Sequence, residues 1–133
     1  MRRFLFMCAQ QGAAWTAAAA LVGVGLNYLT RPNQSSRQVF GVPIDTSDER
    51  LYLLSKAARD VGLGLIAGAL LVRREKVAAA TALGIGAAGP LLDGALLLVA
   101  RGPKPQLTAH WGVAALMGVA AWALAHDGQE PSG

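Results

Sequence analysis

The chain has 133 residues, of which 53% are hydrophobic and 15% are charged, and its mean hydropathy is +0.39. This composition excludes an ordinary soluble domain and predicts one integral membrane domain over residues 1–133. The net charge of +4 comes from Lys and Arg scattered over termini and loops, without a basic stripe, so no nucleic-acid partner is expected. These cations are instead expected to contact membrane lipid.

The first apolar stretch predicts a transmembrane helix over residues 4–29. Its charged start, Arg2-Arg3, and its many alanines are also typical of a signal peptide. However, Gln10 and Gln11 interrupt the expected apolar core of a signal, and the apolar run continues well beyond them. We therefore expect a retained helix, which ends before Pro32 because proline disfavours a helical residue in front of it.

Residues 31–46 are expected to form a polar loop. Val39, Phe40, Val42 and Ile44 would be wasted in a fully solvated linker, so the loop could fold over the mouth of the bundle as a lid. The alternative is an unstructured loop with a patch that dips into the membrane. Thr46 and Glu49 then have the spacing of a capping box, which predicts the start of the next helix.

The helix predicted over residues 47–73 contains Lys56, Arg59 and Asp60 within an apolar length. A charge inside a membrane span costs about 2.5–3.5 kcal/mol on insertion scales, which makes each of these residues a candidate functional residue. About 27 residues reach about 40 Å, so the first turns should project into the headgroups. Gly64 and Gly68 form a GxxxG pair that would let another helix approach closely.

Two further helices are predicted over residues 77–100 and 108–126. The first contains Asp93 and also Pro90, which should kink it, and Thr108 can cap the second. The fold class is therefore all-α, an integral membrane four-helix bundle with up-down-up-down topology and both termini on one side. Lys and Arg are equally numerous on the two sides, five each, so orientation is weakly determined; we expect cytoplasmic termini in the cell (inner) membrane.

Helix geometry places the polar residues at matching depths. Asp60 lies about 10 Å below the surface at which its helix enters the membrane, and Asp93 lies about 12 Å below the same surface. Asn27 and His110 lie nearer the mouth on that side. Lys56 and Asp60 can pair at i and i+4, which leaves Arg59 free to bind Asp93 or a ligand.

This constellation has two interpretations. In the structural one, a Lys56–Asp60 pair and an Arg59–Asp93 bridge neutralise one another and only pin two helices together. In the functional one, the helices enclose a pocket that is open to one membrane face. One carboxylate there, with its pKa raised by burial, acts as general acid or base while the other stays ionised.

Other chemistries have less support. The lone Cys8 and two histidines make a metal site improbable, and no cofactor is expected. The glycine-rich segment that starts at Gly84 lies in an apolar span without a following Lys, so it is expected to serve helix packing.

The order of motifs Arg31-Pro32, Phe40-Gly41-Val42, Ala58-Arg59-Asp60, Asp93-Gly94 and His110 resembles a family of small integral membrane proteins catalogued only as a domain of unknown function, DUF4267. The likeness extends from about Gly12 to Ala125. It implies four membrane helices and polar family positions at Arg59, Asp60, Asp93 and His110. It implies no established reaction.

The function we expect is a membrane-embedded enzyme that performs acid/base chemistry on a lipophilic small molecule, such as isomerisation, cyclisation or epoxide opening. Asp60, Asp93 and His110 would be catalytic, and Arg59, Lys56 and Asn27 would bind the substrate. The alternatives are a proton-coupled small-molecule transporter and a non-catalytic scaffold subunit. The chain could also form a homo-oligomer.

Overall fold

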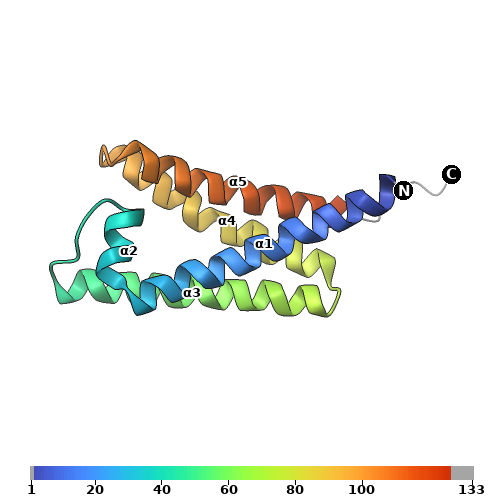
Figure 1. Ribbon diagram of the computed structural model, residues 1–133, viewed down its shortest axis with the longest axis horizontal. Coiled ribbons are helices and arrows are strands. Elements are labelled where there is room, and N and C mark those ends of the chain that lie inside the picture. Colours follow the sequence, from blue (N-terminus) through green and yellow to red (C-terminus); the bar gives the residue numbers. More distant parts are fainter. Residues whose placement is uncertain (1, 127–133) are drawn as a thin grey trace.

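The computed structural model describes residues 2–126, with side chains from Gln11 onward. Five helices and no strand occur in this range, which confirms the predicted all-α class (Figure 1). They are α1 (Arg2–Thr30), α2 (Pro32–Val39), α3 (Ser47–Val72), α4 (Lys76–Val99) and α5 (Lys104–His126). Four of them are long, and their bounds lie within a few residues of the predicted ones.

The fifth helix, α2, lies in the segment that was expected to be a polar loop. A backbone N–H in the first turn of a helix has no acceptor within the helix, so proline, which lacks this group, fits there. Pro32 occupies this position in α2. The Ser35 hydroxyl donates to the Asn27 carbonyl at 3.0 Å, and the Ser36 hydroxyl donates to the Val42 carbonyl at 2.8 Å. These two bonds attach α2 to the end of α1 and to the segment that follows.

Two helix starts were predicted from capping residues, and one of the two predictions is confirmed. The predicted capping box is confirmed: Glu49 N donates to Thr46 Oγ1 at 3.2 Å, and Thr46 N donates to Glu49 Oε2 at 2.9 Å. In contrast, α5 begins at Lys104, four residues before the predicted start. The Thr108 hydroxyl donates to the Pro105 carbonyl inside this helix and does not cap it.

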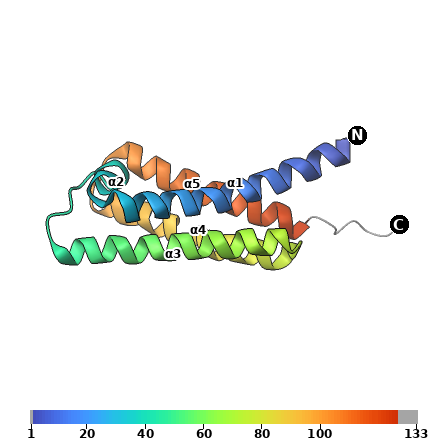
Figure 2. The ribbon, with the colours of Figure 1, turned by 60° about the horizontal axis from the view of Figure 1, so that its bottom comes forward.

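The helices pack as two pairs, α1 with α3 and α4 with α5 (Figures 1 and 2). Helices α1 and α3 pack closely because two glycines lie directly against the backbone of the partner helix. A Cβ built on Gly64 would lie 2.7 Å from the Ala18 carbonyl oxygen, and one built on Gly25 would lie 2.8 Å from the Ala57 carbonyl oxygen. Gly68, the other member of the GxxxG pair, has only the Trp15 ring nearby, at 3.8 Å.

Apolar side chains, most of them alanine, form the larger core between the pairs, and Leu83 and Met117 are among its largest fully buried members. A second core cluster of Tyr28, Leu53 and Ala57 packs against Val39, Phe40 and Ile44. The α2 segment therefore covers one end of the bundle through its apolar residues, as expected of a lid. Figure 2 shows α2 lying across this end, where α1 finishes and α5 starts.

The outer surface suits a membrane. Among the described residues, three segments are long and apolar enough to cross one: Gln11–Thr30, Lys76–Val99 and Lys104–His126. Large apolar side chains such as Ile66, Ile85 and Val119 are more than half exposed. A soluble monomer rarely presents so much apolar surface, so these features indicate a membrane protein.

Candidate functional site

The polar centre of the bundle is a cluster of five side chains, Lys56, Arg59, Asp60, Asp93 and His110, which we call the ion cluster. It joins α3, α4 and α5 near the end that α2 covers. Four of its members are buried, and only the Arg59 side chain is substantially exposed, at 48%. The sequence placed these residues on three helices, and the structure brings them together.

Lys56 is the shared cation of the cluster. Its Nζ lies 3.1 Å from Asp60 Oδ2, one turn along α3, and 2.7 Å from Asp93 Oδ2 on α4. The contact with Asp60 is a hydrogen bond, whereas the closer contact with Asp93 is an ion pair outside hydrogen-bond geometry. One ammonium thus compensates two buried carboxylates.

Arg59 pairs with Asp60 and not with Asp93, which corrects one expected pairing. Its Nη2 lies 3.2 Å and its Nε 3.3 Å from Asp60 Oδ1. The Arg59 guanidinium lies against α4 at Gly89, which has no side chain. A Cβ built on Gly89 would lie 3.1 Å from Nη2. Asp60 therefore has two cationic partners, while Asp93 shares one. With a neutral histidine, the formal charges of the cluster cancel.

Asp93 and His110 form the less compensated side of the cluster. His110 Nδ1 lies 3.9 Å from Asp93 Oδ2, which is beyond hydrogen-bond distance but within a small side-chain movement of it. Both side chains are buried, and His110 Nε2 has no hydrogen-bond partner among the described residues. An unsatisfied buried nitrogen of this kind calls for a ligand, a water or a catalytic explanation.

Two aromatic residues that the sequence reasoning did not assign to the site complete it. The Tyr28 and Phe40 rings stack with centroids 6.3 Å apart, and Phe40 contacts the His110 ring at 5.3 Å. Lys56 Nζ lies 5.8 Å from the centre of the Tyr28 ring, within the range of a cation–π interaction. The available signal was weak: a tyrosine at the end of an apolar helix, and a phenylalanine in the predicted lid.

Asn27 does not join the ion cluster. Its backbone carbonyl accepts the Ser35 hydroxyl, and its side chain lines neither of the pockets beside the cluster. One residue further along α1, Tyr28 is buried and faces Lys56. The polar group that α1 provides here is therefore the tyrosine.

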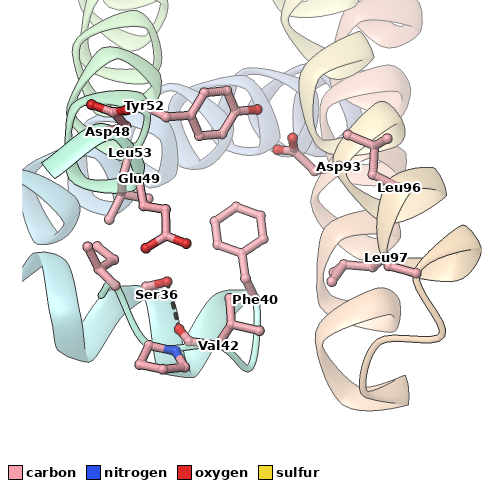
Figure 3. A pocket seen from close by; sticks show the side chains of 13 residues that line it. Ser36, Phe40, Val42, Asp48, Glu49, Tyr52, Leu53, Asp93, Leu96 and Leu97 are labelled. Atoms are coloured by element: carbon pink, nitrogen blue, oxygen red, sulfur yellow. Dashed lines mark hydrogen bonds between the residues drawn. The ribbon is translucent and has the colours of Figure 1, made fainter. Parts of the chain in front are cut away.

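A large pocket of ≈ 530 Å³ opens on one side of the cluster, between α3, α4 and the segment after α2 (Figure 3). Asp93 is its only lining residue from the ion cluster. Figure 3 shows the Asp93 carboxylate and the Tyr52 side chain both directed into it. The rest of the lining is mostly apolar, with two acids near the start of α3: Ser36, Phe40, Val42, Pro43, Ile44, Asp48, Glu49, Leu53, Leu96, Leu97 and Ala100.

A small pocket of ≈ 190 Å³ lies on the other side of the cluster and is lined by all five helices. Lys56, Asp60 and His110 face it, so the cluster separates the two pockets. The remaining lining residues are Ala20, Leu21, Val24, Tyr28, Gln38, Val39, Pro90, Ala109 and Val113. Among the side chains that the structure describes, from Gln11 to His126, no group of three or more His, Cys, Asp or Glu could hold a metal ion.

The fold and the site define a helical bundle of membrane type with a buried, charge-balanced cluster between two mainly apolar pockets. Residues 18–124 match the family described as Domain of unknown function (DUF4267), and the chain belongs to this family. No curated protein sequence and no solved structure matches the chain. The function must therefore be argued from the site itself.

Proposed function

We propose that the protein is an integral membrane enzyme that performs acid/base chemistry on a lipophilic small molecule bound in the large pocket. The reaction is an isomerisation, a cyclisation or an epoxide opening, and it needs no cofactor. The large pocket has the size of typical small-molecule sites and the mainly apolar lining that such sites share. Its few polar groups are grouped at Asp93 and at the start of α3.

The observation that carries the proposal is the unequal pairing of the two aspartates. Asp60 contacts two cations, Lys56 and Arg59, and does not line the large pocket. Asp93 shares its cation with Asp60 and lines the pocket. Two carboxylates in such different environments suit different roles, with Asp93 transferring the proton and Asp60 remaining a fixed anion.

In this mechanism the Asp93 carboxylate, held by Lys56, takes a proton from one position of the substrate. Asp93 in its acid form then returns a proton to an oxygen or a double bond at another position, which restores the carboxylate beside Lys56. The histidine beside Asp93 assists this exchange. A well-placed general acid or base contributes about 10²–10⁴-fold in rate.

The bundle would cross the membrane with all four long helices, α3 included, in up-down-up-down order. The charges of α3 are then tolerable because Lys56 and Asp60 face the bundle interior and are paired. We propose the cell (inner) membrane with cytoplasmic termini, membrane lipid around the apolar surface, and a homo-oligomer as a further option. A proton-coupled transporter is less well supported, because the core beyond the cluster is built of apolar side chains.

The test compares wild type, Asp93→Asn and Asp60→Asn, each purified in detergent. Turnover is followed by mass spectrometry on a panel of terpenoid epoxides, allylic alcohols and polyenes, and thermal unfolding is followed in parallel. We expect Asp93→Asn to fold and to lose about 10²-fold or more of the activity. Retained activity in this variant would refute the assignment, and unfolding of both variants without any wild-type turnover would favour a scaffold.

A further inference from the structure

The charged residues that line the large pocket are all acidic. They are Asp48, Glu49 and Asp93, three of the eight acids of the chain. None of the lysines and arginines that the structure describes lines this pocket, although the chain has twelve Lys and Arg. A cleft lined by charges of one sign focuses their field, so this pocket is negative in a chain whose net charge is +4.

The first two turns of α3 supply two of these acids together with part of the apolar wall. Asp48 and Tyr52 are four residues apart, as are Glu49 and Leu53, and this spacing puts each pair on one side of the helix. All four residues line the pocket. Figure 3 shows the Glu49 carboxylate inside the pocket, on the side of the Phe40 ring.

The start of the helix uses only part of this negative charge. Glu49 Oε2 accepts the N–H groups of Asp45 and Thr46, which leaves Oε1 outside the capping box. Neither Asp48 nor Glu49 has an ion-pair partner among residues 11–126. Both residues are exposed, so two carboxylates without a cation stand at the mouth of the pocket.

Asp93 lies at the inner end of the pocket and is only 7% exposed. Its contacts with Lys56 and His110 are made by Oδ2, and no hydrogen bond to Oδ1 occurs among the described side chains. Figure 3 shows the carboxylate directed into the pocket. A buried carboxylate that lacks a donor on one oxygen favours a ligand that brings one.

We propose that the large pocket binds a lipophilic amine. Its protonated amino group lies beside Asp48 and Glu49, and its hydrocarbon body lies along Leu96 and Leu97 toward Asp93. The same acids would repel a ligand with a carboxylate or phosphate group, and a neutral ligand would leave them without a cation. That this amine is the substrate rests on the proposed function, whereas its binding does not.

The pocket suits both parts of such a molecule. Aromatic faces attract ammonium groups, and the Phe40 and Tyr52 rings line the pocket together with the two acids of α3. In the membrane arrangement proposed above, the start of α3 lies at the headgroups and Asp93 lies deeper. An amphiphilic amine has the same order of polarity, with its charged group at the surface and its body in the apolar interior.

The experiment compares three probes, geranylamine, geraniol and geranic acid, which share one hydrocarbon skeleton and differ in their head group. Full-length protein in dodecyl maltoside, an uncharged detergent, is titrated with each probe at neutral pH. Native mass spectrometry gives the fraction of protein that is bound. Each probe partitions differently into micelles, so the deciding quantity is the ratio of geranylamine to geraniol affinity, compared between wild type and variants.

Asp48→Asn and Glu49→Gln each remove one negative charge with little change of shape, and glutamine can keep the capping box. The double variant should lower the affinity ratio about tenfold, the effect of one hydrogen bond to a charged group, while geraniol binds as it does to wild type. Asp45→Asn is the matched control, because Asp45 is an exposed acid of the same segment that does not line the pocket. Thermal unfolding verifies that each variant is folded.

An unchanged ratio in the double variant would overturn the inference, and so would tightest binding of geranic acid. Loss of amine binding in Asp93→Asn alone would overturn the placement of the amino group at the start of α3. Amine binding without turnover of any compound would contradict the proposed enzyme and leave the amine site standing. Turnover of a neutral compound with an unchanged ratio would do the reverse.

Discussion

The ammonium of Lys56 on α3 lies 2.7 Å from the carboxylate of Asp93 on α4, and the two side chains are only 7% and 9% exposed. This contact crosses between the two helix pairs of the bundle. The ion pair also lies between the two pockets, because Asp93 lines the large pocket and Lys56 lines the small one. The ion pair that joins the two helix pairs therefore also belongs to the candidate site.

Lys56→Met should destabilise the protein by about 3–5 kcal/mol, because it takes the lysine partner away from the buried Asp93 carboxylate and leaves Asp60 with Arg59. Reversible unfolding in mixed detergent micelles measures the loss. Lys104→Met, an exposed cation at the start of α5, should change stability little. Adding Asp93→Asn to Lys56→Met should restore part of the loss, and a strictly additive double variant would contradict the pairing.

The contact between α1 and α3 gives a second prediction, based on two glycines of one helix. Gly64→Ala should lower the melting temperature by several degrees, since the new methyl group would lie 2.7 Å from the Ala18 backbone oxygen and would push the helices apart. Gly62→Ala meets nothing within 4 Å and should be neutral or slightly stabilising. Equal melting temperatures for both variants would show that the helices do not pack closely here.

Helical rise alone was enough to predict that Asp60 and Asp93 lie at similar depth, because the rise per residue is nearly constant. The rotation of each helix about its axis was not available from the sequence. A step of one residue turns a side chain by about 100°, so whether Asn27 or Tyr28 faces the cluster depends on how α1 packs. The pairing of Arg59 with Asp60 likewise depends on the bare backbone at Gly89, a contact between two helices.

The short helix α2 could not be predicted with confidence from its own residues, since PNQSSRQV lacks a continuous apolar face. Contacts with other parts of the chain hold α2 in place. Two of its serine hydroxyls donate to carbonyls outside the helix, and the apolar residues at its end pack on Tyr28 and Leu53. The lid was one of two alternatives left open for this segment, and the packing of Val39, Phe40 and Ile44 agrees with it. The capping box of α3, in contrast, is a local motif and was readable directly.

That capping box should make the start of α3 sensitive to acid. Two backbone N–H groups, of Asp45 and Thr46, donate to the Glu49 carboxylate and lower its pKa below the ordinary value of 4.5. Since the folded-state pKa is depressed, the stabilisation is fully present above pH 4.5 and is lost as the pH falls through the folded pKa. Hydrogen exchange of residues 44–50, corrected for intrinsic rates, should therefore accelerate as the pH falls below 4.5.

Glu49→Gln is the matched variant for this effect, because glutamine can keep the hydrogen bonds of the box but does not titrate. It should show little acceleration over the same pH range. Equal acceleration in wild type and variant would assign the acid sensitivity to another group.

Phe40 should control the separation of the two pockets. Its ring lines the large pocket and packs between Tyr28 and His110, whose ring centroids lie 6.3 and 5.3 Å away. Phe40→Ala should remove this partition, so that a lipophilic fluorophore in the large pocket is quenched more readily by water-soluble iodide. Because Phe40 is only half-buried, the stability loss should stay below the ~3–5 kcal/mol of a fully buried phenylalanine.

Phe40→Leu keeps an apolar side chain in place and should leave the quenching close to that of wild type. If Phe40→Ala changes stability but not quenching, the ring only fills space and does not separate the pockets. If both variants bind the fluorophore and quench alike, the partition belongs to the Lys56–Asp93 pair instead. In that case Lys56→Met, and not Phe40→Ala, is the variant that should raise quenching.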